Sequence, residues 1–301
     1  MKKYIKRIHR ICLWCVCGIL ILTGCERSRN VPLDPPIYKP QLMIHCLASP
    51  LSGAQAEIRY NKPLRDEDID LVPPLPQMEA WLLNNGERIQ TFTQDSSGSF
   101  SIPAGDLILE TGKDYAMEVV DLTNDRTYIS GSTTLPEQPG IHSITAKRDI
   151  ASFGEYALEI LLEGVDQPVK AISVFPVLLD SLGQPVTQIP DGSLVKLTPW
   201  NKVRYYLWYN NDGTWSEKEL LLRQRGGYQD KNDEYINANE VNVTVTYLSE
   251  ELTRFVRDLD ETYFSGEDIF QLVRPVYSNF KNTAGIFGVY NEIELKVEIE
   301  D

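Results

Sequence analysis

The chain contains five cysteines, the residue type that forms disulfides and binds metal ions. Cys12 and Cys15 have the C-x-x-C spacing of redox and zinc sites. Both lie in an apolar run, 11–22, that follows a strongly basic stretch, 1–10, which is the pattern of a cleaved export signal. The run spans only about 18 Å as a helix, too little for a bilayer core of roughly 30 Å. We therefore expect all three cysteines before position 24 to be removed with residues 1–24.

Cys25 lies at the end of the apolar run, in Leu22-Thr23-Gly24-Cys25. This tetrapeptide resembles the lipobox of bacterial lipoproteins, in which the cysteine thiol is alkylated by a diacylglycerol and the signal is cut just before it. We expect lipidation of Cys25; the alternative is an ordinary signal peptide with a chance cysteine. Residues 25–40 contain four prolines and little apolar content, which predicts an extended tether between the lipid and the folded body.

Cys46 is then the last thiol of the mature chain, so neither an intrachain disulfide nor a cysteine metal site is expected. It alternates with Leu42 and Ile44 in a strand-like apolar run, which favours a buried, unreactive thiol over a reactive one.

Two histidines remain in the mature chain, His45 and His142, and neither belongs to a known catalytic motif. His45 lies within a strand pattern and His142 lies beside a linker, so neither is placed like the base of a triad. We expect no enzyme, no metal site and no cofactor. A lipid-anchored hydrolase built on a pair of carboxylates, or on one of these histidines, stays a lower alternative.

Aromatic side chains gather around the Asn210–Gly213 turn and are the candidate ligand-binding residues, since flat rings stack on sugars or peptide side chains. The four selected are Trp200, Tyr206, Trp208 and Trp215. The alternative is a sheet face covered by a helix or by the other domain. Ser181, in Asp180-Ser181-Leu182, matches a short O-glycosylation pattern of Bacteroidota and is a candidate modification site.

Short strands separated by turn signals predict a mainly β fold with two tandem β-sandwiches of the immunoglobulin or transthyretin type. We place the first sandwich at residues 41–138 and the second at 139–301, divided at the Pro- and Gly-containing segment 135–140. One amphipathic helix is expected at about 249–264, capped by Ser249 and packed by its apolar stripe on the second sandwich. The alternative is a helix that docks a partner.

The charge of the mature chain limits its partners. Loss of residues 1–24 removes five of the 29 basic side chains and no acid, which leaves 24 against 43 acidic side chains, a formal charge of −19. Nucleic acids and anionic lipid surfaces need basic patches, so neither is expected as a partner, and contact with the membrane is expected through the lipid alone.

The C-terminal stretch 275–288 (PVYSNFKNTAGIFG) resembles the ending P-x-x-x-N-I-x-x-G-x-G-I-F-G of an uncharacterised family of Bacteroidota lipoproteins, whose domain has no known function. The opening strand 42–47, the tetrapeptide 112–115 (GKDY) and the segment 133–136 (TTLP) are also similar. In this chain Phe280 replaces the family's isoleucine, and 283–284 (TA) replace the commoner glycine. The motif predicts a turn followed by a final strand, in which Asn279 and Gly285 are residues that tolerate positive φ.

The resemblance implies an outer-membrane lipoprotein that faces the cell exterior and is often encoded beside a TonB-dependent receptor. The leading hypothesis is therefore a non-enzymatic accessory of such a transporter that helps to capture a glycan or peptide nutrient. A structural or anchoring component of a surface fimbria or adhesin is the alternative. The resemblance supplies no catalytic or binding residues.

Overall fold

The computed structural model describes residues 39–62, 66–96, 98–150, 156–163, 171–186, 206–209, 219–225, 227–229, 235–264 and 276–300. Within these residues the fold is mainly β, as the sequence predicts, with one α-helix, α3 (Glu250–Phe264). In this part of the chain no helix is long and apolar enough to cross a membrane.

The N-terminal half is a β-sandwich. Its elements are β1 (Leu42–Ser49), β2 (Gly53–Tyr60), the 3-10 helix η1 (Asp66–Leu71), β3 (Met78–Asn84), β4 (Glu87–Thr91), β5 (Thr93–Gln94), β6 (Phe100–Ile102), β7 (Asp114–Asp121), β8 (Arg126–Ile129) and β9 (Thr133–Thr134). One sheet runs β1–β2–β6–β5, and the other runs β4–β3–β7–β8 with β9 also paired to β7. Alternate side chains of both sheets meet in one core, because successive residues of a strand point to opposite faces.

The turns of this sandwich follow their sequence signals. The β3–β4 hairpin turns at Asn85 and Gly86, whose φ angles are 49° and 83°, as a two-residue Asn-Gly loop requires. The next turn is held by Asp95, whose side chain accepts a hydrogen bond from the Ser99 amide at 3.0 Å.

The C-terminal half contains the remaining elements: β10 (Ser143–Ile150), β11 (Tyr156–Glu163), β12 (Ala171–Leu179), β13 (Tyr206–Tyr209), β14 (Glu219–Arg225), β15 (Gly227–Gln229), β16 (Tyr235–Asn237), β17 (Glu240–Leu248), α3 and β18 (Ala284–Glu300). Strands β13–β12–β17 pair in order, and β11 pairs with both β10 and β14. Side chains from β10, β12, β14 and β17 share a second core.

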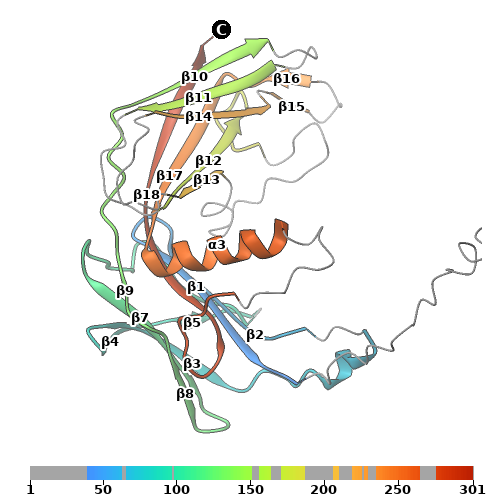
Figure 1. Ribbon diagram of the computed structural model, residues 1–301, viewed down its shortest axis with the longest axis vertical. Helices are drawn as coiled ribbons and strands as arrows, with labels where there is room; N and C mark the ends of the chain where they lie inside the picture. Colours follow the sequence, from blue (N-terminus) through green and yellow to red (C-terminus); the bar gives the residue numbers. More distant parts are fainter. Residues whose placement is uncertain are drawn as a thin grey trace, which may run out of the picture. The chain divides into compact units, whose positions relative to one another are not determined.

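Strand β18 links the two halves (Figure 1). Its residues 284–289 pair in parallel with β1, residues 290–298 pair antiparallel with β17, and residues 299–300 pair with β10. A chain segment from the C-terminus thus completes the sheet of the N-terminal sandwich. The predicted domain limits, 41–138 and 139–301, stay a prediction; the sequence did not predict that the final strand would serve both halves.

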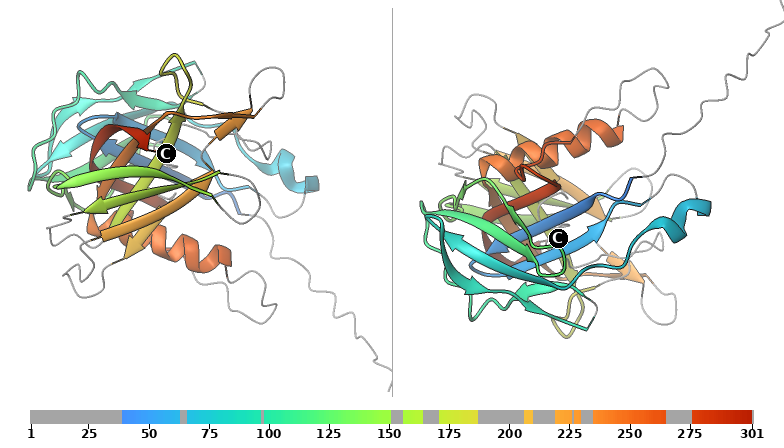
Figure 2. Two further views of the ribbon diagram at one scale, coloured as in Figure 1. Left: turned by 90° about the horizontal axis from the view of Figure 1, so that it is seen from above. Right: turned by 90° about the horizontal axis from the view of Figure 1, so that it is seen from below.

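Helix α3 lies against this shared strand, on the opposite face of the β1–β18 sheet from the N-terminal core (Figure 2, right). Its apolar stripe, including Leu252, Phe255 and Val256, packs on Ile286 and Tyr290 in a third core. The apolar stripe of the helix is buried, as the sequence predicts, but at the join between the halves, where it contacts Leu47 of β1 as well as β18.

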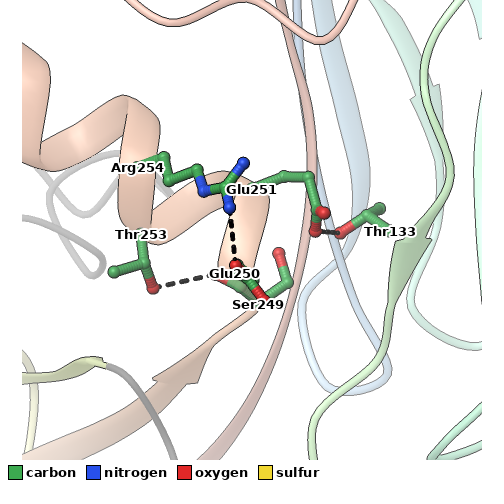
Figure 3. A network of polar contacts seen from close by, with 6 residues as sticks. All are labelled: Thr133, Ser249, Glu250, Glu251, Thr253 and Arg254. Atoms are coloured by element: carbon green, nitrogen blue, oxygen red, sulfur yellow. Dashed lines mark hydrogen bonds and ion pairs between the residues drawn. The ribbon is translucent and has the colours of Figure 1, made fainter. Parts of the chain in front are cut away.

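Polar contacts at the start of α3 cap the helix and fasten it to the N-terminal sandwich (Figure 3). Ser249 caps the helix by accepting a hydrogen bond from the Leu252 amide at 3.5 Å. Glu251 accepts a hydrogen bond at 2.9 Å from the hydroxyl of Thr133, which belongs to β9 of the N-terminal sandwich. Arg254 pairs with Glu250 one turn earlier, at 2.8 Å.

Candidate functional site

The structure describes only part of the predicted aromatic site. Trp200 and Trp215 lie outside the described residues, as does the predicted lipidation residue Cys25. Tyr206 and Trp208 lie on β13 and pair with Val174 and Ile172 of β12. Trp208 is partly buried and packs against the core of the C-terminal half. Ligand binding by the four aromatic residues stays a prediction.

Ser181 lies where a modifying enzyme has access. It is exposed, in a tight turn after β12, next to Leu182, which is 81% exposed. The Asp180 carboxylate accepts hydrogen bonds from the Leu182 amide at 2.9 Å and the Gln184 amide at 2.8 Å, which fixes the turn. O-glycosylation of Ser181 stays a prediction, at an exposed residue.

Cys46 is completely buried in the N-terminal core, which confirms the prediction of a buried thiol. Burial raises its pKa far above the ordinary value, so the reactive thiolate does not form near neutral pH. His45, on the opposite face of β1, contacts the ring of Phe255 edge-on, with ring centroids 5.7 Å apart. Burial, and then the nearby Arg59 charge, lower the pKa of His45. Neither group is placed as an exposed catalytic residue.

A buried carboxylate lies at the join between the halves. Glu292, only 2% exposed, accepts a hydrogen bond from the Ser49 hydroxyl at 2.7 Å and another from the Ser52 hydroxyl. Ser49 in turn accepts a hydrogen bond from the Leu51 amide at 3.1 Å. The carboxylate thus fastens the β1–β2 turn to β18, a structural role. Among the described residues, no group of three or more His, Cys, Asp or Glu side chains is arranged to hold a metal ion.

The C-terminal motif braces β18 against the N-terminal sandwich. The Asn279 side chain donates to the Phe287 carbonyl at 2.8 Å and accepts from the Phe287 amide at 3.0 Å. Gly285 has φ = 140°, and a Cβ there would lie 1.9 Å from the carbonyl oxygen of Ile44. Ile286 packs under α3, and Phe287 packs in the sandwich core. The motif therefore stabilises the junction between the two halves.

Of the two residues that tolerate positive φ, Gly285 adopts it and Asn279 does not. Among the described residues, the non-glycine positions with positive φ are Asn85 and Asp125. Asn279 is selected by its side-chain amide instead, since one carboxamide can both donate to and accept from the same backbone unit.

Among the described residues, a cleft lies in the N-terminal sandwich, beside the β3–β4 hairpin. It encloses about 350 Å³. The side chains that line it come from this hairpin and from the segment that leads into β7, and they are Asn84, Ile89, Gln90, Ile108, Glu110, Lys113 and Tyr115. Ile89 and Ile108 are 49% and 74% exposed, although large apolar side chains are usually covered.

Backbone contacts hold the rim of the cleft in place. The turn 110–113 is closed by a hydrogen bond from the Lys113 amide to the Glu110 carbonyl at 3.1 Å, and Gly112 adopts φ = 75° there. The Glu110 amide donates to the hydroxyl of buried Tyr115 at 2.7 Å. The Gly112 amide donates to the Leu135 carbonyl, and the Leu135 amide donates to the Lys113 carbonyl. The backbone of the rim is thus fixed while the Glu110 and Lys113 side chains stay exposed.

Comparison with known families settles what the chain is related to. A family model described as "Domain of unknown function (DUF4249)" matches residues 29–296. The chain belongs to the DUF4249 family. No curated protein matches it.

In this DUF4249 chain the sequence did not predict the cleft, because its lining residues come from separate segments. Two signals pointed towards it. The tetrapeptide 112–115 supplies the turn glycine, Lys113 and Tyr115. Ile108 lies between Leu107 and Leu109, and three consecutive apolar residues cannot all be buried on one face of a strand. Leu107 is buried and Ile108 is exposed. Such a cleft, with fixed rim and exposed apolar walls, suits binding.

Proposed function

We propose that this protein is a non-enzymatic lipoprotein of the outer membrane that faces the cell exterior and assists a TonB-dependent transporter in capturing a glycan or peptide nutrient. The observation that carries the proposal is the lipobox cysteine, Cys25, at the end of a short apolar run with a basic start. A lipid on Cys25 and the proline-rich tether 25–40 would hold the folded body near the membrane.

Two features of the folded body support binding to a partner or a small ligand. The cleft beside the β3–β4 hairpin has exposed apolar walls. In addition, the connection between β2 and β3 exposes Ile69, Leu71 and Leu75, at 55%, 57% and 42%. Exposed apolar side chains grouped closely along the chain are characteristic of protein–protein contacts. We propose that this connection contacts the transporter.

The test is an affinity purification of the tagged lipoprotein from detergent-solubilised outer membrane, with the bound proteins identified by mass spectrometry. We expect one TonB-dependent barrel in near-equal amount, and a substantial loss of it from the double variant Ile69→Ser/Leu71→Ser. A Leu182→Ser variant, exposed at a distant turn, is the matched control and is expected to retain the barrel.

The same purification separates the alternatives. Recovery of fimbrial subunits in place of a barrel would favour a structural or anchoring role at the cell surface. Recovery of no partner from a monomeric protein would contradict the accessory role. Metabolic labelling with a radioactive fatty acid tests the anchor independently: we expect label on the wild type and none on Cys25→Ser.

A further inference from the structure

The charged side chains at the rim of the cleft do not hold the described part of the fold together. Lys113 and Glu110 are both exposed, and within the described residues neither side chain enters an ion pair or hydrogen bond. Their backbones, by contrast, close the turn 110–113. A fixed backbone presents one free ammonium group and one free carboxylate at the mouth of a cleft.

The apolar wall is shaped by a β-bulge. In the β3–β4 ladder Leu82 pairs with Gln90 and Leu83 pairs with Arg88, so Ile89 is an extra residue on β4. A bulge redirects the side chain it inserts, and this one accompanies a large apolar side chain that is half exposed and lines the cleft. Ile108 adds a second apolar surface to the lining. A bulge on an edge strand also discourages pairing with another strand, so recognition here rests on side chains.

The residue types that line the cleft favour some classes of ligand over others. Sugars are bound by exposed aromatic rings, and the one aromatic residue of the lining, Tyr115, is 2% exposed with its hydroxyl already engaged. Two isoleucines suit an aliphatic side chain. The Gln90 amide nitrogen donates to the Asp106 carbonyl and the Asn84 amide oxygen accepts from Asn85, so the Gln90 amide oxygen and the Asn84 amide nitrogen are the atoms that suit a peptide backbone. The Lys113 ammonium complements a carboxylate, and the Glu110 carboxylate complements an amino group.

We infer that this cleft binds a short peptide that carries a free C-terminal carboxylate and an aliphatic side chain. The carboxylate is paired with Lys113, and the aliphatic side chain lies against Ile89 and Ile108. A cleft of about 350 Å³ falls within the range of small-ligand sites, roughly 300–1,000 Å³. This inference rests on the proposed role in nutrient capture and names its substrate class.

The test is a calorimetric titration of the full-length mature protein in detergent with alanyl-leucyl-leucine, with the C-terminal amide of that tripeptide, and with maltotriose. We expect the free tripeptide to bind the wild type about tenfold more tightly than its amide does, because the amide lacks the charge that Lys113 recognises. Lys113→Gln is expected to weaken the free tripeptide about tenfold and to leave the amide unchanged. Ile108→Ser is expected to weaken both peptides by roughly tenfold.

Matched controls come from exposed side chains outside the cleft. Lys281→Gln and Leu182→Ser change the same residue types and are expected to bind both peptides as the wild type does. Absence of peptide binding at millimolar concentration would overturn the inference. So would binding of maltotriose alone, or an equal effect of Lys113→Gln and Lys281→Gln.

The affinity purification distinguishes this failure from that of the proposed function. Recovery of a TonB-dependent barrel without any peptide binding would sink the cleft assignment and leave the accessory role in place. Peptide binding that depends on Lys113, without a barrel, would sustain the cleft and reject the accessory role.

Discussion

Two regions of this protein use the same residue type in opposite ways. Gly285, at the start of β18, and Gly112, in the rim of the cleft, both adopt positive φ, 140° and 75°. A Cβ on Gly285 would lie 1.9 Å from the Ile44 carbonyl oxygen, whereas a Cβ on Gly112 would meet nothing within 4 Å. The first glycine is needed for a close approach of two strands, and the second only for a turn.

The side chains beside the two glycines also differ in how far they are engaged in contacts. Beside Gly285, Asn279 bonds to the Phe287 backbone, and Phe287 is fully buried. Beside Gly112, the backbone is equally well bonded, but Lys113 and Ile108 extend into the cleft or solvent. A region in which the side chains are engaged holds the fold together, whereas a region with a fixed backbone and unengaged side chains is available to a ligand. Measurements of stability test whether the two regions differ in this way.

The largest effect is expected from Gly285→Ala. The added methyl group collides with backbone, which cannot give way as a flexible side chain does, so we expect a loss of about 4 kcal/mol or more in the free energy of unfolding. Gly112→Ala is the matched control, with an expected loss of about 1 kcal/mol from strained φ alone. Urea unfolding followed by tryptophan fluorescence measures both. Equal losses for the two variants would refute the assignment of Gly285 to a close approach.

A smaller effect is expected from Asn279→Ala, which leaves the amide and carbonyl of Phe287 buried without partners. We expect a loss of about 2–3 kcal/mol. Asn279→Asp restores only the acceptor and places a carboxylate against the carbonyl, so it is not expected to recover the loss. Asn282→Ala, at an exposed position nearby, should change the free energy of unfolding by less than about 0.5 kcal/mol. Full stability of Asn279→Ala would contradict the brace.

Burial of Cys46 predicts a pH dependence. Because burial raises the pKa of the folded thiol, only the unfolded chain releases this proton once the pH exceeds roughly 8.5. The contribution of the buried thiol to the free energy of unfolding is therefore fully present below that pH and is lost as the pH rises above it. We expect the stability gap between the wild type and Cys46→Ala to narrow by up to about 1.4 kcal/mol per pH unit above it.

Urea unfolding of both proteins between pH 7 and 10.5 tests this expectation. Iodoacetamide should label Cys46 only after unfolding, since the thiol is completely buried in the folded chain. A gap that stays constant with pH, or labelling of the native protein, would show that the thiol is accessible.

The smallest effects on stability are expected at the cleft. Lys113→Gln and Ile108→Ser change exposed side chains, so each should alter the free energy of unfolding by less than about 0.5 kcal/mol. Thermal melts of both variants beside the wild type measure this. A large loss of stability at either position would mean that the rim side chains hold the fold, and the contrast with the region around Gly285 would fail.

Features that depend on neighbouring residues were predictable from the sequence. The Asn85–Gly86 turn follows from local conformational preference, and helix α3 follows from its cap and the spacing of its apolar residues. Burial of Cys46 follows from strand alternation. These signals need no knowledge of the rest of the chain, because turn geometry, capping and periodicity act over a few residues.

The role of Asn279 and the cleft were decided by tertiary contacts. Asn279 looked like a turn residue, but its amide is matched to a strand segment eight residues later. The cleft brings Ile89 beside Ile108, and its bulge has no distinctive local sequence. Strand alternation cannot say which neighbouring segment covers an apolar side chain and which leaves it exposed.

The mainly β fold, the helix with its cap, and the family of the chain all follow from the order of its residues. The pairing of β18 in parallel with β1, more than 230 residues earlier in the chain, became evident from the folded structure alone. The physical reason is that a hydrogen bond between two strands does not depend on how far apart the strands lie in the sequence. Any strand with a suitable pattern can pair with β1, and the choice of β18 rests on the close approach that Gly285 permits and on the packing of Ile286 and Phe287 on opposite faces of one sheet.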